Sequence, residues 1–194
     1  MSRRSHRVTV NLDTRGLTDI PERELNAILR GADDIIGTGG RSLLTRILRG
    51  SASKPVLENG LDESPSYGYF RELSNDDTLA RIDWTILNGY LHIDYSHRLP
   101  FLVFTEKGWE IAREIRANEL LEGIAVAISE GPPYRMEHLK DRDREMIFLL
   151  LDKIEATGDP AFVPPLRAWQ KIDYKKVQIR IRQVTRELER IDVG

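Results

Sequence analysis

The sequence has no cysteine, only four histidines and no long apolar run. Without cysteine there is no disulfide framework, no thiol nucleophile and no cysteine-ligated zinc. The histidines, His6, His92, His97 and His138, are scattered with no pair at metal-ligand spacing, and no Ser-His or paired-carboxylate arrangement is visible. We therefore expect a protein that is not an enzyme, with no catalytic residues, no metal site and no cofactor.

The apolar stretches are too short to cross a membrane. The longest, residues 124–128 and 147–151, fall far short of the roughly 20 residues that a transmembrane helix needs. Residues 2–7 are basic but lead into Val8-Thr9-Val10 rather than into an apolar targeting segment. With 40% hydrophobic and 31% charged residues, the composition is typical of a soluble globular protein. We expect a cytoplasmic protein with no membrane partner.

The formal net charge of −2 argues against a nonspecific polybasic binder, but the charge is unevenly distributed. Residues 1–54 carry 10 Lys and Arg against 6 Asp and Glu, residues 55–117 carry 6 against 11, and residues 118–194 carry 13 against 14. A phosphate-binding surface is therefore expected in the first third of the chain.

The pattern between residues 74 and 109 predicts a helix, a hairpin and a second helix. Ser74 followed by Asp77 is typical of a helix N-cap with an acid in the first turn, and apolar residues recur at helical spacing up to Gly89. Two short β-rich runs then flank Ser96-His97-Arg98, and a helix restarts at 105–108. This order predicts a winged helix within an α+β, mainly α, fold.

Six motifs in this region resemble a known domain. They are Ile47-Leu48-Arg49-Gly50-Ser51, Val56-Leu57-Glu58-Asn59-Gly60-Leu61-Asp62, Tyr67-Gly68, Arg71-Glu72-Leu73-Ser74, Asn88-Gly89-Tyr90-Leu91 and Phe104-Thr105-Glu106-Lys107-Gly108. In order and spacing they resemble the RQC domain, the winged helix near the C-terminal end of RecQ-family DNA helicases. The resemblance covers residues 39–116. Neither a helicase motor nor a cysteine zinc module accompanies it, so the chain is similar to the stand-alone RQC-like proteins called RQC-minor.

The resemblance implies binding of duplex, forked or tetraplex DNA, in DNA replication or repair. It divides the chain into a strand and helix lead-in (1–38), the RQC-like winged helix (39–116) and a helical C-terminal region (117–194). The turn at 157–166 in the last region resembles the inter-helix turn of HEAT-like repeats. Two alternatives stay open: an adaptor whose winged helix and HEAT-like helices bind a protein partner, and an RNA-binding protein.

The lead-in is expected to hold one strand and one helix. Residues 8–12 alternate apolar and polar side chains, as a short strand does, and Pro21 opens a helix with a break near Gly31. The glycine-rich run at 37–42 is interpreted as an interhelical turn, and the alternative is a glycine loop that cradles a phosphate.

The turn Arg49-Gly50-Ser51-Ala52-Ser53-Lys54 is the main candidate for phosphate contact. It follows a helix over 41–48 that leaves Arg41 and Arg46 toward solvent, and it precedes a helix over 55–61. Backbone amides, a helix dipole and two cations would meet one phosphate there. The matching turn of RQC domains contacts the DNA backbone, which implies this role for Arg49, Ser51 and Lys54. The alternative is a capping serine beside solvated cations.

Two further groups are candidate DNA contacts. Arg71, which follows Tyr67-Gly68, is a second candidate phosphate contact by the resemblance, whereas the nearby aromatic residues are interpreted as core or loop anchors. In the helix from Ser74, Asp76 and Asp77 disfavour insertion into the major groove, because they repel phosphates. Its other face is predicted to present an outward stripe beside the backbone, formed by Thr78, Arg81, Thr85 and Asn88.

The hairpin tip and the last helix offer the remaining candidates. Tyr95 and His97 are candidates for base stacking and Arg98 for a phosphate, although the hairpin is too short for strand separation to be expected. The alternative is that Tyr95 packs under the turn. The last helix has an apolar seam (Val177, Ile181, Val184, Leu188 and Ile191) and a basic face, which is either a solvated surface or a second site for nucleic acid or a partner.

Overall fold

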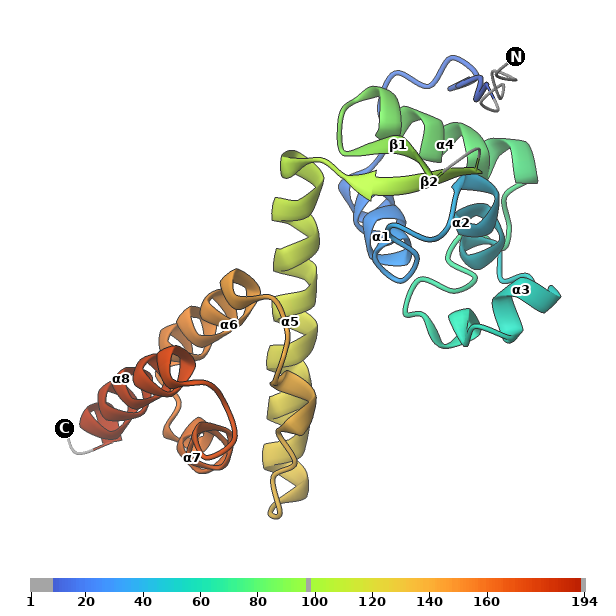
Figure 1. Ribbon diagram of the computed structural model, residues 1–194. Coiled ribbons are helices and arrows are strands. Elements are labelled where there is room, and N and C mark those ends of the chain that lie inside the picture. The colour runs from blue at the N-terminus through green and yellow to red at the C-terminus, as the bar shows by residue number, and fades with distance from the viewer. Residues whose placement is uncertain (1–8, 97–98, 193–194) are drawn as a thin grey trace, which may run out of the picture. The chain divides into compact units, whose positions relative to one another are not determined.

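The computed structural model describes residues 9–96 and 99–192, which form a mainly helical fold with one small sheet (Figure 1). The two strands, β1 (Leu91–Ser96) and β2 (Leu99–Phe104), pair antiparallel as a hairpin. Eight helices are described: α1 (Glu22–Asp33), α2 (Arg41–Leu48), α3 (Lys54–Leu57), α4 (Asn75–Leu87), α5 (Glu106–Glu130), α6 (Arg144–Thr157), α7 (Val163–Gln170) and α8 (Lys175–Asp192). The prediction of an α+β, mainly α, fold with a winged helix is confirmed.

The chain divides into two compact units, one up to Ala112 and one from Arg113. The N-terminal unit contains α1 to α4, the hairpin and the start of α5, and the C-terminal unit contains the rest of α5 with α6 to α8. Each unit has its own apolar core. Among the described residues, no helix combines the length and the apolar character that crossing a bilayer requires.

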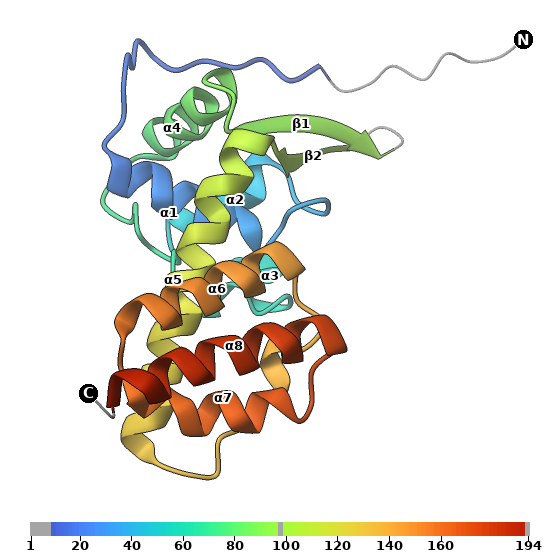
Figure 2. The same ribbon diagram turned by 90° about the vertical axis from the view of Figure 1, so that its left-hand side faces the viewer.

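The core of the N-terminal unit forms where α1, α2 and α4 meet one face of the hairpin. Ile28, Leu48 and Ile82, one from each helix, are fully buried. Side chains alternate between the two faces of a strand, so Leu91 and Leu102 reach this core while His92 and Asp94 remain exposed. Figure 2 shows the hairpin extending to one side of these helices.

Local signals begin and end α4 where the sequence predicted. The Ser74 hydroxyl accepts a hydrogen bond from the backbone N–H of Asp77 at 3.1 Å and thereby caps α4. At the other end of α4, Gly89 takes a φ of +73°, and the N–H groups of Gly89 and Tyr90 donate to the carbonyls of Ile86 and Thr85. These two bonds are the Schellman arrangement that closes a helix at a left-handed glycine.

The glycine run before α2 is an interhelical turn that also pairs with the hairpin. The N–H of Gly37 donates to the carbonyl of Leu102 at 2.9 Å, and the N–H of Leu102 donates to the carbonyl of Gly39 at 2.8 Å. A Cβ at Gly40 would lie 2.8 Å from the Pro100 carbonyl oxygen. Glycine is therefore needed here because two backbones approach closely.

Several local predictions are wrong because tertiary contacts override them. Residues 9–12 alternate in exposure but form no strand. Helix α1 does not break at Gly31, which is buried so tightly that a Cβ would lie 3.3 Å from both Leu44 and Ser66. The helix predicted over 55–61 ends at Leu57, so its dipole is small.

A buried carboxylate on α4 joins three parts of the N-terminal unit. The side chain of Asp83 is only 2% exposed, and it forms an ion pair with Arg41 of α2. Its other oxygen accepts a hydrogen bond from the backbone N–H of Asp13 at 2.8 Å. Arg41 is therefore not directed toward solvent as predicted, and the segment before α1 is tied to α4. In both ribbon views this segment crosses over α4 (Figures 1 and 2).

The C-terminal unit is built around α8, which packs against α6 and α7. The predicted apolar seam is confirmed for Val177, Ile181, Val184 and Leu188, all of which are buried, while the side chain of Ile191 lies outside the described part of the chain. Trp169 of α7 is fully buried, and its indole N–H donates to Asp173 at 2.6 Å. The turn between α7 and α8 is thus anchored from within the core.

Replacing Asp83→Ala should lower the free energy of unfolding by about 3–5 kcal/mol, because it leaves the mostly buried guanidinium of Arg41 without its partner. Urea unfolding followed by tryptophan fluorescence measures this loss. The control Asp76→Ala removes a carboxylate that is 74% exposed, and it should change stability by less than about 1 kcal/mol. Equal stability of the two variants would contradict the role assigned to Asp83.

Two glycines of α5 should respond in opposite directions to alanine. A Cβ at Gly108 would overlap the carbonyl oxygen of Tyr90, so Gly108→Ala should destabilise the protein by about 3 kcal/mol. Gly123 has no atom near its Cβ position, so Gly123→Ala should stabilise it by up to about 1 kcal/mol through helix propensity. Urea titrations of both variants test the pair, and a harmless Gly108→Ala would refute the close contact.

Candidate nucleic-acid interface

The α2–α3 corner, residues 49–54, is a rigid turn built by the end of α2. Gly50 has a φ of +69°, and its N–H donates to the Ile47 carbonyl at 2.9 Å. The N–H of Ser51 donates to the Arg46 carbonyl, also at 2.9 Å. These bonds form the same Schellman closure as at α4, so the corner has one defined backbone path.

A second loop packs against this corner. The N–H of Gly68 donates to the Ile47 carbonyl at 2.9 Å, and the N–H of Phe70 donates to the Leu48 carbonyl at 2.7 Å. A Cβ on Gly50 would lie 3.1 Å from the Cα of Gly68, so the two glycines touch backbone to backbone. The loop that carries Arg71 is thereby held beside the corner that carries Arg49 and Lys54.

The cations at the corner differ in how far each side chain is exposed to solvent and in how it is bonded to the protein. The side chain of Lys54 is 80% exposed and has only a loose ion pair with Glu58, at 3.5 Å. Arg71 is exposed, although its Nε donates to the Gly68 carbonyl at 3.3 Å. Arg49 is half-buried, and its Nε donates to the Leu73 carbonyl at 3.1 Å. Arg49 therefore joins the two loops, whereas Lys54 and Arg71 present charge to solvent.

The two serines of the corner are turned inward. Ser51 is half-buried, and its hydroxyl accepts a hydrogen bond from the N–H of Ser53 at 3.3 Å. The hydroxyl oxygen of Ser53 is buried and has no hydrogen-bond partner among the described residues. Ser53 therefore does not cap α3 with its side chain, and the predicted contact from Ser51 has only part of its side chain available.

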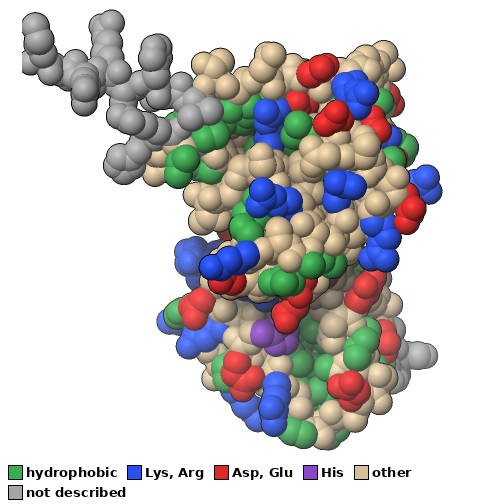
Figure 3. Space-filling model, turned by 90° about the vertical axis from the view of Figure 1, so that its right-hand side faces the viewer, with side chains coloured by type: hydrophobic (Ala, Val, Ile, Leu, Met, Phe, Trp, Pro, Cys, Tyr) green, Lys and Arg blue, Asp and Glu red, His purple; other side chains and the backbone are tan. Residues whose placement is uncertain are grey.

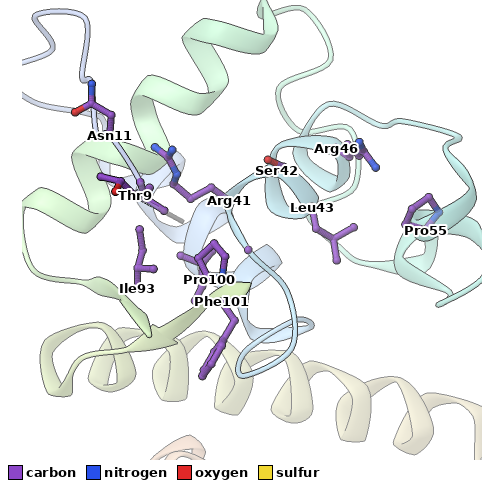
Figure 4. Close-up of a pocket in the computed structure, with 13 residues that line it drawn as sticks. Thr9, Asn11, Arg41, Ser42, Leu43, Arg46, Pro55, Ile93, Pro100 and Phe101 are labelled. Carbon is purple, nitrogen blue, oxygen red and sulfur yellow. The ribbon is translucent and has the colours of Figure 1, made fainter. Parts of the chain in front are cut away.

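A groove of about 580 Å³ runs from this corner to the hairpin (Figure 4). Arg46 and Pro55 line the end near the corner, and Ile93, Pro100 and Phe101 line the end formed by the strands. Arg46 is exposed and forms no ion pair within the described residues. The groove therefore has a cationic end and an apolar end next to the hairpin.

The hairpin is as short as the sequence predicted, because the strands pair as far as Ser96 and Leu99. Tyr95 is half-buried and lies opposite Pro100. The two tip residues predicted to contact DNA, His97 and Arg98, lie outside the described residues. Leu99 is 72% exposed beside the tip, so it adds an apolar side chain that sequence reasoning did not single out.

The outward stripe predicted on α4 is wrong. Thr78 and Thr85 are fully buried, and their hydroxyls donate to backbone carbonyls one turn earlier in the helix. Arg81 is largely buried in an ion pair with Glu24 of α1 at 2.8 Å. The stripe faces α1 and the core instead of solvent, because α1 and the segment before it cover this side of α4. Of the four residues in the predicted stripe, only Asn88, at the end of the helix, is exposed.

The positive end of α4 is also neutralised within the protein. Arg15, from the segment before α1, lies 3.0 Å from Asp77 and 4.0 Å from Asp76. The acids satisfy the helix dipole and are themselves paired with Arg15, so this end is occupied by protein groups. The exposed cations at and near the corner are Arg46, which lines the groove, and Lys54 and Arg71, which do not.

Figure 3 shows the side from which α3 projects in Figure 1, with Lys and Arg side chains spread over the N-terminal unit and a few Asp and Glu among them. Sequence reasoning had left Arg46 out of the site, although its position one turn before Arg49, which directly follows the same helix, was a usable signal.

Among the described residues, no group of three or more His, Asp or Glu side chains is placed to hold a metal ion.

The comparisons with known proteins agree with this geometry. The family model described as the RQC domain matches residues 22–121, which include α1, the α2–α3 corner, α4, the hairpin and the first part of α5. No curated protein and no solved structure matches the chain. The match covers more than half of the chain and starts earlier than the 39–116 expected from the motifs. The chain therefore belongs to the RQC family of DNA-binding winged helices.

Proposed function

We propose that the N-terminal unit binds DNA through the sugar-phosphate backbone, which it contacts between the α2–α3 corner and the β1–β2 hairpin. The ligands proposed are duplex DNA and forms that share its backbone, forked and tetraplex DNA, in DNA replication or repair. Membership of a DNA-binding family supports DNA as the ligand class. The observation that carries the proposal is the set of exposed cations at and near the corner, Arg46, Lys54 and Arg71, of which Arg46 lines the groove that leads to the hairpin.

The arrangement favours phosphate contacts over reading of bases. A recognition helix must insert an exposed face into the major groove. On α4 the predicted face is buried, and the N-terminal acids Asp76 and Asp77 would repel phosphates. The corner instead presents cations on a rigid backbone, which suits contacts that position DNA without selecting a sequence. Weak dependence of affinity on DNA sequence and strong dependence on salt are therefore expected.

The hairpin is proposed to lie against the end of the duplex rather than to separate strands. Its strands pair as far as Ser96 and Leu99, and the described apolar groups near that end are Leu99 and the half-buried Tyr95. A single exposed leucine offers apolar contact to a terminal base pair. We therefore expect binding to forked DNA without unwinding.

Charge reversal at the corner should weaken DNA binding. The triple variant Arg46→Glu, Lys54→Glu, Arg71→Glu should lower affinity for a blunt duplex at least about tenfold and reduce the salt slope by about 3, because three phosphates are no longer neutralised by the protein. Fluorescence anisotropy at two salt concentrations measures both. The matched control is Arg23→Glu, because Arg23 is exposed at the start of α1 and has no ion pair within the described residues.

Parallel titrations with forked DNA, tetraplex DNA and a matched RNA hairpin assign the ligand. Equal affinity of the triple variant and the unaltered protein for every DNA form would remove the proposed function. Tighter binding of the RNA hairpin than of its DNA counterpart would move the assignment from DNA to RNA. A loss of the same size in the Arg23→Glu variant would mean that net charge, and not the corner, determines affinity.

Arg49 should behave differently from these exposed cations. Because its Nε donates to the Leu73 carbonyl, Arg49→Lys keeps the charge but removes a hydrogen bond, and should lower the free energy of unfolding by about 1.5–3 kcal/mol. Lys54→Ala, at a side chain that is 80% exposed, should change stability by less than about 0.5 kcal/mol. Urea unfolding compares them, and an unaffected Arg49→Lys would show that the bond is dispensable.

A further inference from the structure

We infer that the C-terminal unit carries a second nucleic-acid-binding surface, a groove at the start of α8 in which a single strand stacks a base on Tyr174 and places phosphates on Arg144, Lys175 and Lys176. This groove lies outside residues 22–121, the part of the chain that matches the RQC domain. The inference rests on observations in the C-terminal unit alone, so it does not depend on DNA binding by the N-terminal unit.

Tyr174 is an exposed ring in a fixed position. The side chain lies in the turn before α8, and the residue is 59% exposed. Its hydroxyl donates a hydrogen bond to the carboxylate of Asp141, and its backbone N–H donates to Asp173 at 2.6 Å. Asp173 is itself buried and bonded to the indole of Trp169. The ring is therefore held from both ends while much of it faces solvent, which lowers the entropy cost of stacking a ligand on it.

The phenol of Tyr174 remains a neutral donor. Its hydrogen bond to Asp141, together with the negative charge of that carboxylate, raises the pKa of Tyr174 above the ordinary value of 10.0. The phenolate is disfavoured, since it would face a second negative charge. Asp141, which takes a φ of +65°, is thus engaged with Tyr174.

The groove beside this ring is cationic. It has a volume of about 480 Å³, and its charged lining consists of Arg142, Arg144, Lys175 and Lys176 against the carboxylates Asp141 and Asp173. Both carboxylates already accept hydrogen bonds from Tyr174, and Asp173 also accepts one from Trp169. In addition, the Nζ of Lys140 lies 5.4 Å from the centre of the Tyr174 ring.

Several cations elsewhere in the C-terminal unit are paired, whereas three of those at the groove are not. Arg180 lies 2.7 Å from both Asp152 and Glu155, and Lys153 lies 2.6 Å from Glu114. Within the described residues, Arg144, Lys175 and Lys176 form no ion pair, although all three are exposed. The groove therefore gathers three exposed cations without an ion pair beside the Tyr174 ring, whereas Arg182 and Arg186, which also form no ion pair within the described residues, do not line it.

Two of these cations lie at the N-terminus of a helix, where positive charge is unfavourable. Lys175 and Lys176 open α8, a helix of 18 residues whose first turn contains no acid. The N-terminus of a helix carries partial positive charge, so lysines there raise the local potential. An anion bound in the groove relieves this repulsion, and the repulsion therefore favours a phosphate ligand.

A single strand fits both features of the groove. Proteins that bind single-stranded nucleic acid combine a cationic groove for the backbone with aromatic rings on which bases stack. A duplex keeps its base faces covered except at its ends, and an acidic peptide would use the cations but has no base to place on Tyr174. The 2′-hydroxyl is not discriminated by stacking or by phosphate contact, so DNA and RNA single strands share the required chemistry.

The test is a titration of the full-length protein with labelled oligothymidylate and oligouridylate, both unable to form duplexes. Tyr174→Ala and the double variant Lys175→Glu, Lys176→Glu should each weaken binding about tenfold. Tyr174→Phe keeps the ring but loses the hydrogen bond to Asp141, so it should weaken binding by less than Tyr174→Ala does. The matched control Arg186→Glu alters an exposed cation on the same helix, and should also have little effect.

Circular dichroism and urea unfolding identify any variant that loses its fold, and Tyr174→Leu, which keeps an apolar side chain without a ring, replaces Tyr174→Ala in that case. Unchanged affinity in the ring and lysine variants overturns the inference, and so does a loss of equal size in Arg186→Glu. A blunt duplex titrated in parallel measures the binding proposed for the α2–α3 corner of the N-terminal unit. Loss of single-strand binding with duplex binding retained therefore supports this groove as a separate surface.

Discussion

The buried carboxylate of Asp83 is the interaction on which the N-terminal unit depends most. It joins α4 to Arg41 of α2 and to the backbone of Asp13, three segments that are far apart in the sequence. A charge that is 2% exposed must be paired, so the three segments are held together or the charge is left uncompensated. The segment before α1 consequently lies over α4 and contributes Arg15 to its N-terminal acids.

This arrangement limits where the proposed DNA contact can lie. With α4 covered, the helix that a winged helix usually offers to the major groove has exposed residues only near its two ends. The remaining cationic surface is the turn after α2, whose backbone is set by left-handed Gly50 in contact with Gly68. A rigid turn of this kind presents side chains at constant positions, which favours contact with a regular sugar-phosphate backbone over reading of individual bases.

The arginines of the N-terminal unit divide into two groups that composition cannot separate. Arg41, Arg49 and Arg81 use their guanidinium groups to join elements of the fold. Arg46 and Arg71 keep theirs largely exposed. The C-terminal unit shows the same contrast, since Arg180 is paired twice on α8 while the lysines that open that helix are unpaired within the described residues. In both units the proposed binding surface combines exposed cations that form no close ion pair with a neighbouring groove.

The sequence by itself determined the features that depend on a few neighbouring residues: the Ser74 cap, the helix ends at glycine, the short hairpin, and a corner rich in cations after α2. Only the tertiary structure decided which of those side chains reach solvent. The stripe of α4 was misjudged because its neighbours, α1 and the segment before it, lie about 60 residues away in the chain. Helical periodicity specifies that one face is buried but not which second element will cover the other.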